Sequence, residues 1–222
     1  MKKQRVDNKG SAILTVVVVI AFITILAITM LYITSMNYQM KQTDYRNKQS
    51  FYKAEEVLDA LKAELAVEMS EALEYAYQEV MIQYASLSAE QRQVVFRDKF
   101  LEKVNENWTS LVNAAGCDMT VALQMKLPEY EKNFVLPDIS NGEEPADYGI
   151  DTEHARFVLE HVRVRYAEDG YSSFVCTDIA LCVPELKLEY DKSTNIGEGA
   201  GIPEREKIEL TDYIIYMNWS KY

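Results

Sequence analysis

The chain has 222 residues, of which 48% are hydrophobic and 26% charged, and its formal net charge is −12. This acidic balance argues against a nucleic-acid partner, because binding to phosphates requires a basic face. The length allows one folded domain with a proper core beside a membrane segment.

The first 33 residues have the pattern of a basic leader followed by a membrane-spanning helix. Residues 1–10 carry +3, and none of the 21 residues from Ile13 to Ile33 is Asp, Glu, Lys or Arg. A helix of this length spans roughly the 30 Å of a bilayer core, whereas a secretory signal has only about 7–15 apolar residues. We therefore predict a retained transmembrane helix over residues 11–36. A buried core helix is the alternative interpretation.

The charge distribution predicts the orientation of this helix. Since residues 1–33 carry +3 and the whole chain carries −12, the remaining residues carry −15. By the positive-inside rule, the basic N-terminus stays in the cytoplasm and the acidic part is exported. We expect a single-pass protein of the cell membrane with an exported C-terminal domain.

Residues 37–115 are predicted to form an amphipathic helical region. No proline or glycine occurs in residues 11–85, so the membrane helix is expected to continue outward, although residues 37–47 could fray or bend. Apolar residues at steps of mostly three and four form one stripe along this helix: Tyr38, Tyr45, Phe51, Ala54, Leu58, Leu61, Leu65, Met69, Ala72, Ala76 and Val80.

A second helix is predicted from Ser88 to Ala115. Ser88-Ala89-Glu90-Gln91 is a capping box, and Gly116 suits the C-terminal end. The expected buried face consists of Val94, Leu101, Val104, Trp108 and Leu111.

Residues 116–222 are predicted to form an antiparallel β-sheet region. Apolar and polar residues alternate from Cys117 to Leu127, which is typical of a strand with one buried face. Residues 128–153 are expected to be a long surface loop. Asp169-Gly170 predicts a hairpin between strands at 157–166 and 171–183.

The remaining C-terminal residues complete this sheet region. Leu186, Leu188 and Tyr190 suggest a short strand, residues 197–201 a flexible loop, and Tyr213 to Trp219 a last strand.

The order of these elements predicts an α+β fold: a long N-terminal helix packed on an antiparallel sheet, with the second helix inserted between. Five residues are expected in the core: Leu61, Leu65, Val121, Leu123 and Val164.

The three cysteines favour no particular disulfide. Cys176 and Cys182 lie too far apart along one strand to pair, so any bridge would include Cys117. Three unpaired, buried thiols are the preferred interpretation of this odd count.

The residues do not suggest an enzyme. His154 and His161 are seven residues apart near a predicted strand and make a poor metal pair, and residues 170–173 lack the second glycine of a nucleophile elbow. Residues 197–201 lack the lysine of a phosphate-binding loop. We expect no catalytic residue, no cofactor and no metal.

An acidic loop is the best of the weak metal candidates. It contains six carboxylates: Asp138, Glu143, Glu144, Asp147, Asp151 and Glu153. Calcium prefers such oxygen ligands, but residues 138–142 depart from an EF-hand loop. A solvated acidic loop is the favoured interpretation.

Three features of the N-terminal region belong together: the basic leader ending in Gly10, the stretch Gly10-Ser11-Ala12-Ile13-Leu14, and the stretch Asn47-Lys48-Gln49-Ser50-Phe51-Tyr52-Lys53-Ala54-Glu55-Glu56. With these features the region resembles type IV prepilins, and PilX-type minor pilins most closely. The resemblance covers about residues 5–65.

This resemblance implies that a prepilin peptidase cuts between Gly10 and Ser11 and that the new terminus is methylated. The apolar helix would first anchor the subunit and later pack with other pilin subunits in a filament at the cell surface. Major pilins usually have glutamate as the fifth residue of the mature chain, whereas this chain has Thr15. The difference favours a minor pilin or pseudopilin of a type IV pilus or type II secretion-like filament.

A second function class stays open on the residues alone. It is a single-pass, membrane-anchored envelope protein with a ligand-binding ectodomain. The processing site separates the two classes, because only a pilin needs Gly10 and a cut after it.

Overall fold

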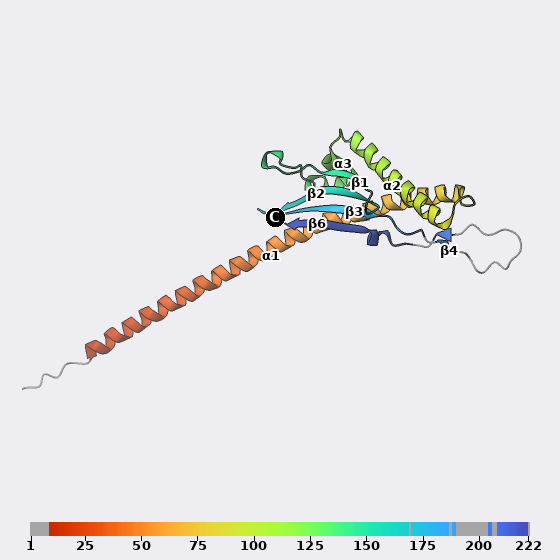
Figure 1. The fold of residues 1–222 in the computed structure, drawn as a ribbon. Helices are drawn as coiled ribbons and strands as arrows, with labels where there is room; N and C mark the ends of the chain where they lie inside the picture. The colour runs from red at the N-terminus through yellow and green to blue at the C-terminus, as the bar shows by residue number, and fades with distance from the viewer. Residues whose placement is uncertain (1–8, 169, 187, 190–203, 206–207, 222) are drawn as a thin grey trace, which may run out of the picture. The chain divides into compact units, whose positions relative to one another are not determined.

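The computed structural model describes residues 9–168, 170–186, 188–189, 204–205 and 208–221 (Figure 1). Within these described residues the chain forms three α-helices followed by β-strands, and the main sheet has the antiparallel strand order β1-β2-β3-β6. The predicted α+β fold is therefore confirmed. The elements are α1 (Lys9–Ile82), α2 (Ala89–Ala114), α3 (Met119–Lys126), β1 (Asp147–Asp151), β2 (Arg156–Glu168), β3 (Tyr171–Cys182), β4 (Leu188–Glu189), β5 (Glu204–Arg205) and β6 (Ile214–Lys221).

Helix α1 runs through two compact units, and the boundary between them in the sequence lies after Gln49. Up to that residue its large apolar side chains are exposed. The polar residues 37–47 stay helical. In the second unit, Ser50–Tyr222, the eight stripe residues from Ala54 to Val80 are at most 1% exposed, and Phe51 is half-buried. The stripe prediction is wrong for Tyr38 and Tyr45 of the first unit, which are exposed. One helix therefore supplies both an uncovered apolar segment and the main element of the core.

The predicted second helix is confirmed as α2, together with both of its caps. Ser88 Oγ accepts a hydrogen bond from the Gln91 amide at 3.3 Å, and Gln91 Oε1 accepts one from the Ser88 amide at 2.9 Å. At the other end Gly116 has φ +74°, and the Cys117 amide donates to the Val112 carbonyl at 2.9 Å. This is a Schellman ending, in which glycine avoids the strain of a left-handed backbone.

The buried face of α2 is partly different from the prediction. Phe96 and Phe100 are buried, whereas Val94 is 46% exposed and Leu111 is only half-buried. The large aromatic side chains lie four residues apart in line with Val104 and Trp108, and they bury more apolar area than valine. They therefore set the rotation of the helix.

The strand predicted for residues 117–127 is wrong, because these residues contain helix α3. Asp118 Oδ1 accepts hydrogen bonds from the amides of Thr120 and Val121 at 2.8 and 3.2 Å, which is an N-cap. The alternation required Thr120 and Ala122 to be exposed, but both are buried, and Val121 is only half-buried. The other four predicted core residues are confirmed.

The predicted loop of residues 128–153 is also more structured than expected. It contains 3-10 turns at Pro128–Asn133 and Ile139–Asn141 and ends in the edge strand β1. Phe134 is buried and bridges to Val164 of β2. The segment between Phe134 and β1 is therefore attached to the sheet at both of its ends.

The predicted hairpin is confirmed as β2 and β3. Glu168 pairs with Tyr171, and Gly170 has φ +80° in the connection. The last strand is confirmed as β6, and β4 with β5 forms a two-stranded ribbon. Leu186 precedes β4, while Tyr190 and residues 197–201 lie outside the described residues.

Helix α2 and residues 50–82 of α1 pack against the same face of the sheet, which we call the inner face. Trp108 of α2 stacks on Phe157 of β2, with ring centroids 6.4 Å apart. On β6, Tyr216 donates a hydrogen bond to the Leu58 carbonyl of α1 at 2.8 Å. Tyr216 pairs with Ile179 and lies on the same face as Phe157, as the register shows. The outer face carries the alternate residues of the strands.

Candidate functional site

The predicted processing position lies at the beginning of α1. Gly10 and Ser11 are in the first turn of the helix, and Thr15 is exposed about one turn further along. The amides of a first turn have no partner within the helix, and glycine lowers helix stability by about 1 kcal/mol. Opening this turn for a peptidase therefore costs little.

The apolar part of α1 is long and apolar enough to span a membrane once, by length and composition. Its mean hydropathy reaches 3.0, and none of that stretch is buried. The hydroxyls of Thr24, Thr29 and Thr34 each donate to the carbonyl four residues earlier at 2.8 Å. These polar groups are satisfied inside the helix, so the segment can contact lipid or another apolar helix without a polar partner.

The acidic loop is held by basic side chains rather than arranged around a central point. Arg156 Nε lies 2.8 Å and His154 Nδ1 2.9 Å from Asp151 Oδ2. Desolvation raises the pKa of Asp151, but hydrogen bonds from the His154 backbone and from both side chains outweigh it and lower the pKa to about 2. In the described part of the chain, no three Asp, Glu, His or Cys residues are placed to hold a metal.

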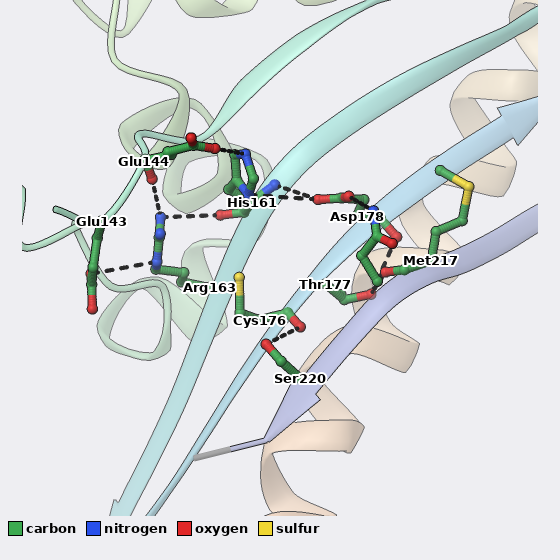
Figure 2. A network of polar contacts seen from close by, with 10 residues as sticks. Glu143, Glu144, His161, Arg163, Cys176, Thr177, Asp178, Met217 and Ser220 are labelled. Atoms are coloured by element: carbon green, nitrogen blue, oxygen red, sulfur yellow. Dashed lines mark hydrogen bonds and ion pairs between the residues drawn. The ribbon is translucent and has the colours of Figure 1, made fainter.

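The two histidines lie in different places. His154 belongs to the turn before β2, whereas His161 lies on the outer face of β2. The Nε2 atom of His161 is 2.8 Å from Glu144 Oε2, and its Nδ1 is 3.9 Å from Asp178 Oδ1 (Figure 2). Each ring nitrogen thus faces a carboxylate, which makes this imidazole an electrostatic link between the loop and the sheet.

Asp178 is the centre of a polar network that the sequence analysis did not identify. It lies on the central strand β3 and is 7% exposed. Its Oδ1 accepts from the His161 amide at 2.7 Å (Figure 2). Its Oδ2 accepts from Asn218 Nδ2 at 2.5 Å. His161 and Asn218 have φ of 55° and 50°, and the register shifts beside both of them.

One carboxylate therefore supports irregularities in the two strands that flank β3. Such bulges bend and twist a strand and redirect its side chains. The signal in the sequence was a single aspartate inside the otherwise uncharged stretch Ser172–Cys182, because a buried charge needs partners.

A shallow depression of about 350 Å³ lies beside this network on the outer face. Its lining residues are Glu143, Arg163, Phe174, Cys176 and Ser220. Arg163 Nη1 donates to the Glu144 carbonyl at 2.6 Å, and this hydrogen bond attaches the acidic loop to strand β2. The pKa of the Cys176 thiol is raised by burial, so the group stays protonated and is a poor nucleophile. The depression is suited to binding rather than to covalent chemistry.

All three cysteine thiols are free in the structure. Cys117 is exposed at the end of α2, so the interpretation of three buried thiols is wrong for this residue. It occupies the position after Gly116 with φ 65°, where the backbone leaves the helix toward solvent. Cys176 and Cys182 are half-buried on β3.

Comparisons of the chain with protein-family models, with curated proteins and with solved structures find no match.

Proposed function

We propose that this chain is a minor pilin or pseudopilin, a structural or assembly subunit that a prepilin peptidase processes after Gly10. Its partners would be the peptidase and other pilin subunits, and its role is structural rather than catalytic. Before assembly it would be a single-pass membrane protein with an exported domain, and afterwards part of a filament at the cell surface.

The observation that carries this proposal is the continuity of α1. The chain passes from an uncovered apolar segment to the main core helix of the domain within Lys9–Ile82, without proline or glycine after Gly10. An ordinary anchor needs only a tether between membrane and domain. A filament subunit benefits from a continuous helix, because the helix couples the packing of the apolar segment to the position of the domain.

Thr15 supports a minor role within such a filament. An unpaired carboxylate in hydrocarbon is expensive, and a threonine avoids that cost but forgoes a charged partner. A subunit with this residue is suited to few positions in a filament. It would either prime the assembly of the filament or cap its end.

The experiment compares Gly10→Glu with a matched control, Asn8→Glu, in cells that contain a prepilin peptidase. Both substitutions lower the leader charge by one, but only the first changes the residue before the predicted cut. Mass spectrometry of the membrane-extracted protein should find Ser11 as the N-terminus of the wild type and of Asn8→Glu. Gly10→Glu should stay uncut in the membrane. An uncut wild type would refute the proposal.

The alternative function is a membrane-anchored envelope protein whose ectodomain binds a ligand. The depression at Arg163 favours this alternative, because it offers a cation and an aromatic wall in one place. An uncut wild-type protein that keeps its place in the membrane would support this second candidate.

A further inference from the structure

The guanidinium of Arg163 is buried but not fully used by the protein. The residue is 7% exposed, and only its Nη1 makes hydrogen bonds, to the carbonyls of Glu144 at 2.6 Å and His161 at 3.5 Å. Its Nε lies 3.6 Å from Glu143 Oε2, which is beyond a good hydrogen bond. Among the described residues, nothing accepts from Nε or Nη2 within hydrogen-bond distance.

These two nitrogens form the edge of the guanidinium that suits a carboxylate. An Arg fork can donate two parallel hydrogen bonds to two carboxylate oxygens, and such pairs are stronger than neutral hydrogen bonds. Neither nitrogen is among the fully buried side-chain atoms of the described residues that lack a partner, so both reach the depression and can donate to a ligand. In the absence of a ligand, the carboxylate of Glu143 occupies this position at the rim of the depression. Its side chain is 39% exposed and contacts the guanidinium only loosely.

The surroundings of Arg163 favour an anion with an apolar part. The register places Cys176 opposite Arg163 and Phe174 opposite Arg165, all on the outer face. Arg165 is exposed and adds a second positive charge beside the depression. Phe174 and the neutral thiol of Cys176 give the depression an apolar wall. The cationic side of the depression thus consists of Arg163 and Arg165, and Glu143 lies at its rim.

We propose that the outer-face depression binds a carboxylate group, which takes two hydrogen bonds from Nε and Nη2 of Arg163 and displaces the side chain of Glu143. The carboxylate belongs either to an acidic side chain of a partner protein or to a small free acid. The site goes beyond the assembly role and does not depend on it.

The thiol of Cys176 provides the readout, because it lines the depression. The full chain in detergent micelles is treated with excess iodoacetamide over a long time course, because a protonated thiol reacts slowly. The reaction is run with and without glutarate, and alkylation is followed by peptide mass spectrometry. At a free glutarate concentration ten times its Kd, Cys176 should react about tenfold more slowly. Cys182 is the internal control, since it is also half-buried on β3 but does not line the depression. Equal protection of both thiols, or of neither, would overturn the proposal.

Two substitutions and a neutral probe test the role of the fork. Arg163→Lys keeps the charge but loses the second hydrogen bond, so glutarate should bind about tenfold more weakly. Glu143→Gln removes the carboxylate that competes for Arg163, so this variant should bind glutarate more tightly. Because Glu143 is exposed, this variant should fold and keeps the test valid if the Arg163 variant does not fold. Unchanged affinity in either folded variant, or equal protection by the neutral diamide glutaramide, contradicts the proposed contacts.

A peptide pair identifies the source of the carboxylate. Protection by the blocked peptide Ac-Gly-Glu-Gly-NH₂ at lower concentrations than glutarate, and none by its Gln counterpart, assigns the site to an acidic side chain of a partner. Protection by glutarate alone assigns the site to a small free acid.

Discussion

Removing the positive charge of Lys126 should destabilise the domain through Glu68. Glu68 is a core residue of α1 whose side chain is 4% exposed, and the Nζ of Lys126 on α3 lies 3.0 Å from its Oε2. Glu64, at 3.9 Å, is the second carboxylate near this ammonium group. In Lys126→Met, Glu68 must either stay charged without its partner or take up a proton.

The free-energy cost of taking up that proton sets an upper limit on the destabilisation by Lys126→Met. A carboxyl group with an ordinary pKa near 4.3 is protonated at pH 7 at a cost of about 4 kcal/mol. Burial already raises the pKa of Glu68 against the attraction of Lys126, so part of this cost is present in the wild type. We expect Lys126→Met to lower the free energy of unfolding by about 2–3 kcal/mol at pH 7.

The pH dependence follows from the direction of this shift. Because the pKa of Glu68 is raised in the folded chain, the folded state holds the proton more tightly than the unfolded state. Stability from this group is therefore present below the unfolded pKa and lost as the pH rises through the folded pKa. The variant raises the folded pKa further, so its deficit should shrink as the pH falls from 7 toward 5.

The assay is urea unfolding of the full chain in detergent, followed by tryptophan fluorescence, to which the buried Trp108 and the more exposed Trp219 both contribute. Glu68→Gln combined with Lys126→Met should recover most of the loss, because no buried charge remains. Lys53→Met breaks an exposed pair with Glu56 and should have no measurable effect. A loss below about 1 kcal/mol, or an equal loss at pH 5 and pH 7, would refute this account of the pair.

Three further predictions concern the core, a helix–sheet contact and the membrane segment. Leu65→Ala should lower the free energy of unfolding by about 2–5 kcal/mol in the same assay, whereas the half-buried Val121→Ala should cost clearly less; equal losses would contradict the burial pattern. Tyr216→Phe removes the hydrogen bond to the Leu58 carbonyl and should lower the free energy of unfolding by about 1 kcal/mol. An unchanged denaturant midpoint would contradict this role of the hydrogen bond. If a missing carboxylate limits the subunit to few positions, Thr15→Glu should change its copy number in sheared filaments, as counted by quantitative proteomics; an unchanged number would remove that role from position 15.

Local patterns in the sequence were sufficient for much of the fold. The capping box at Ser88 and the glycine at position 116 bounded α2, because caps depend on residues next to one another. Asp169-Gly170 predicted the β2–β3 hairpin for the same reason. The apolar stripe from Ala54 to Val80 identified the core face of α1, since a helix repeats its faces every 3.6 residues.

The misassigned segment Cys117–Leu127 shows where local patterns fail. Its residues alternate, but small side chains such as Ala122 fit either face, so the period was ambiguous. The cap at Asp118 and the packing of this segment against the rest of the core favoured a helix. The local cap and the tertiary packing together decided for the helix, whereas the alternation alone indicated a strand.

The sequence by itself determined the membrane-length helix, the core face of α1 and the hairpin, because each depends on residues that are close along the chain. Only the tertiary structure brought Arg163 and Glu143 to one depression and joined Asp178 to the bulge at Asn218. These residues are separated by 20 and 40 positions, and their contacts depend on strand register and on the path of a loop. The registers follow from burial of the whole inner face of the sheet, which no single segment encodes.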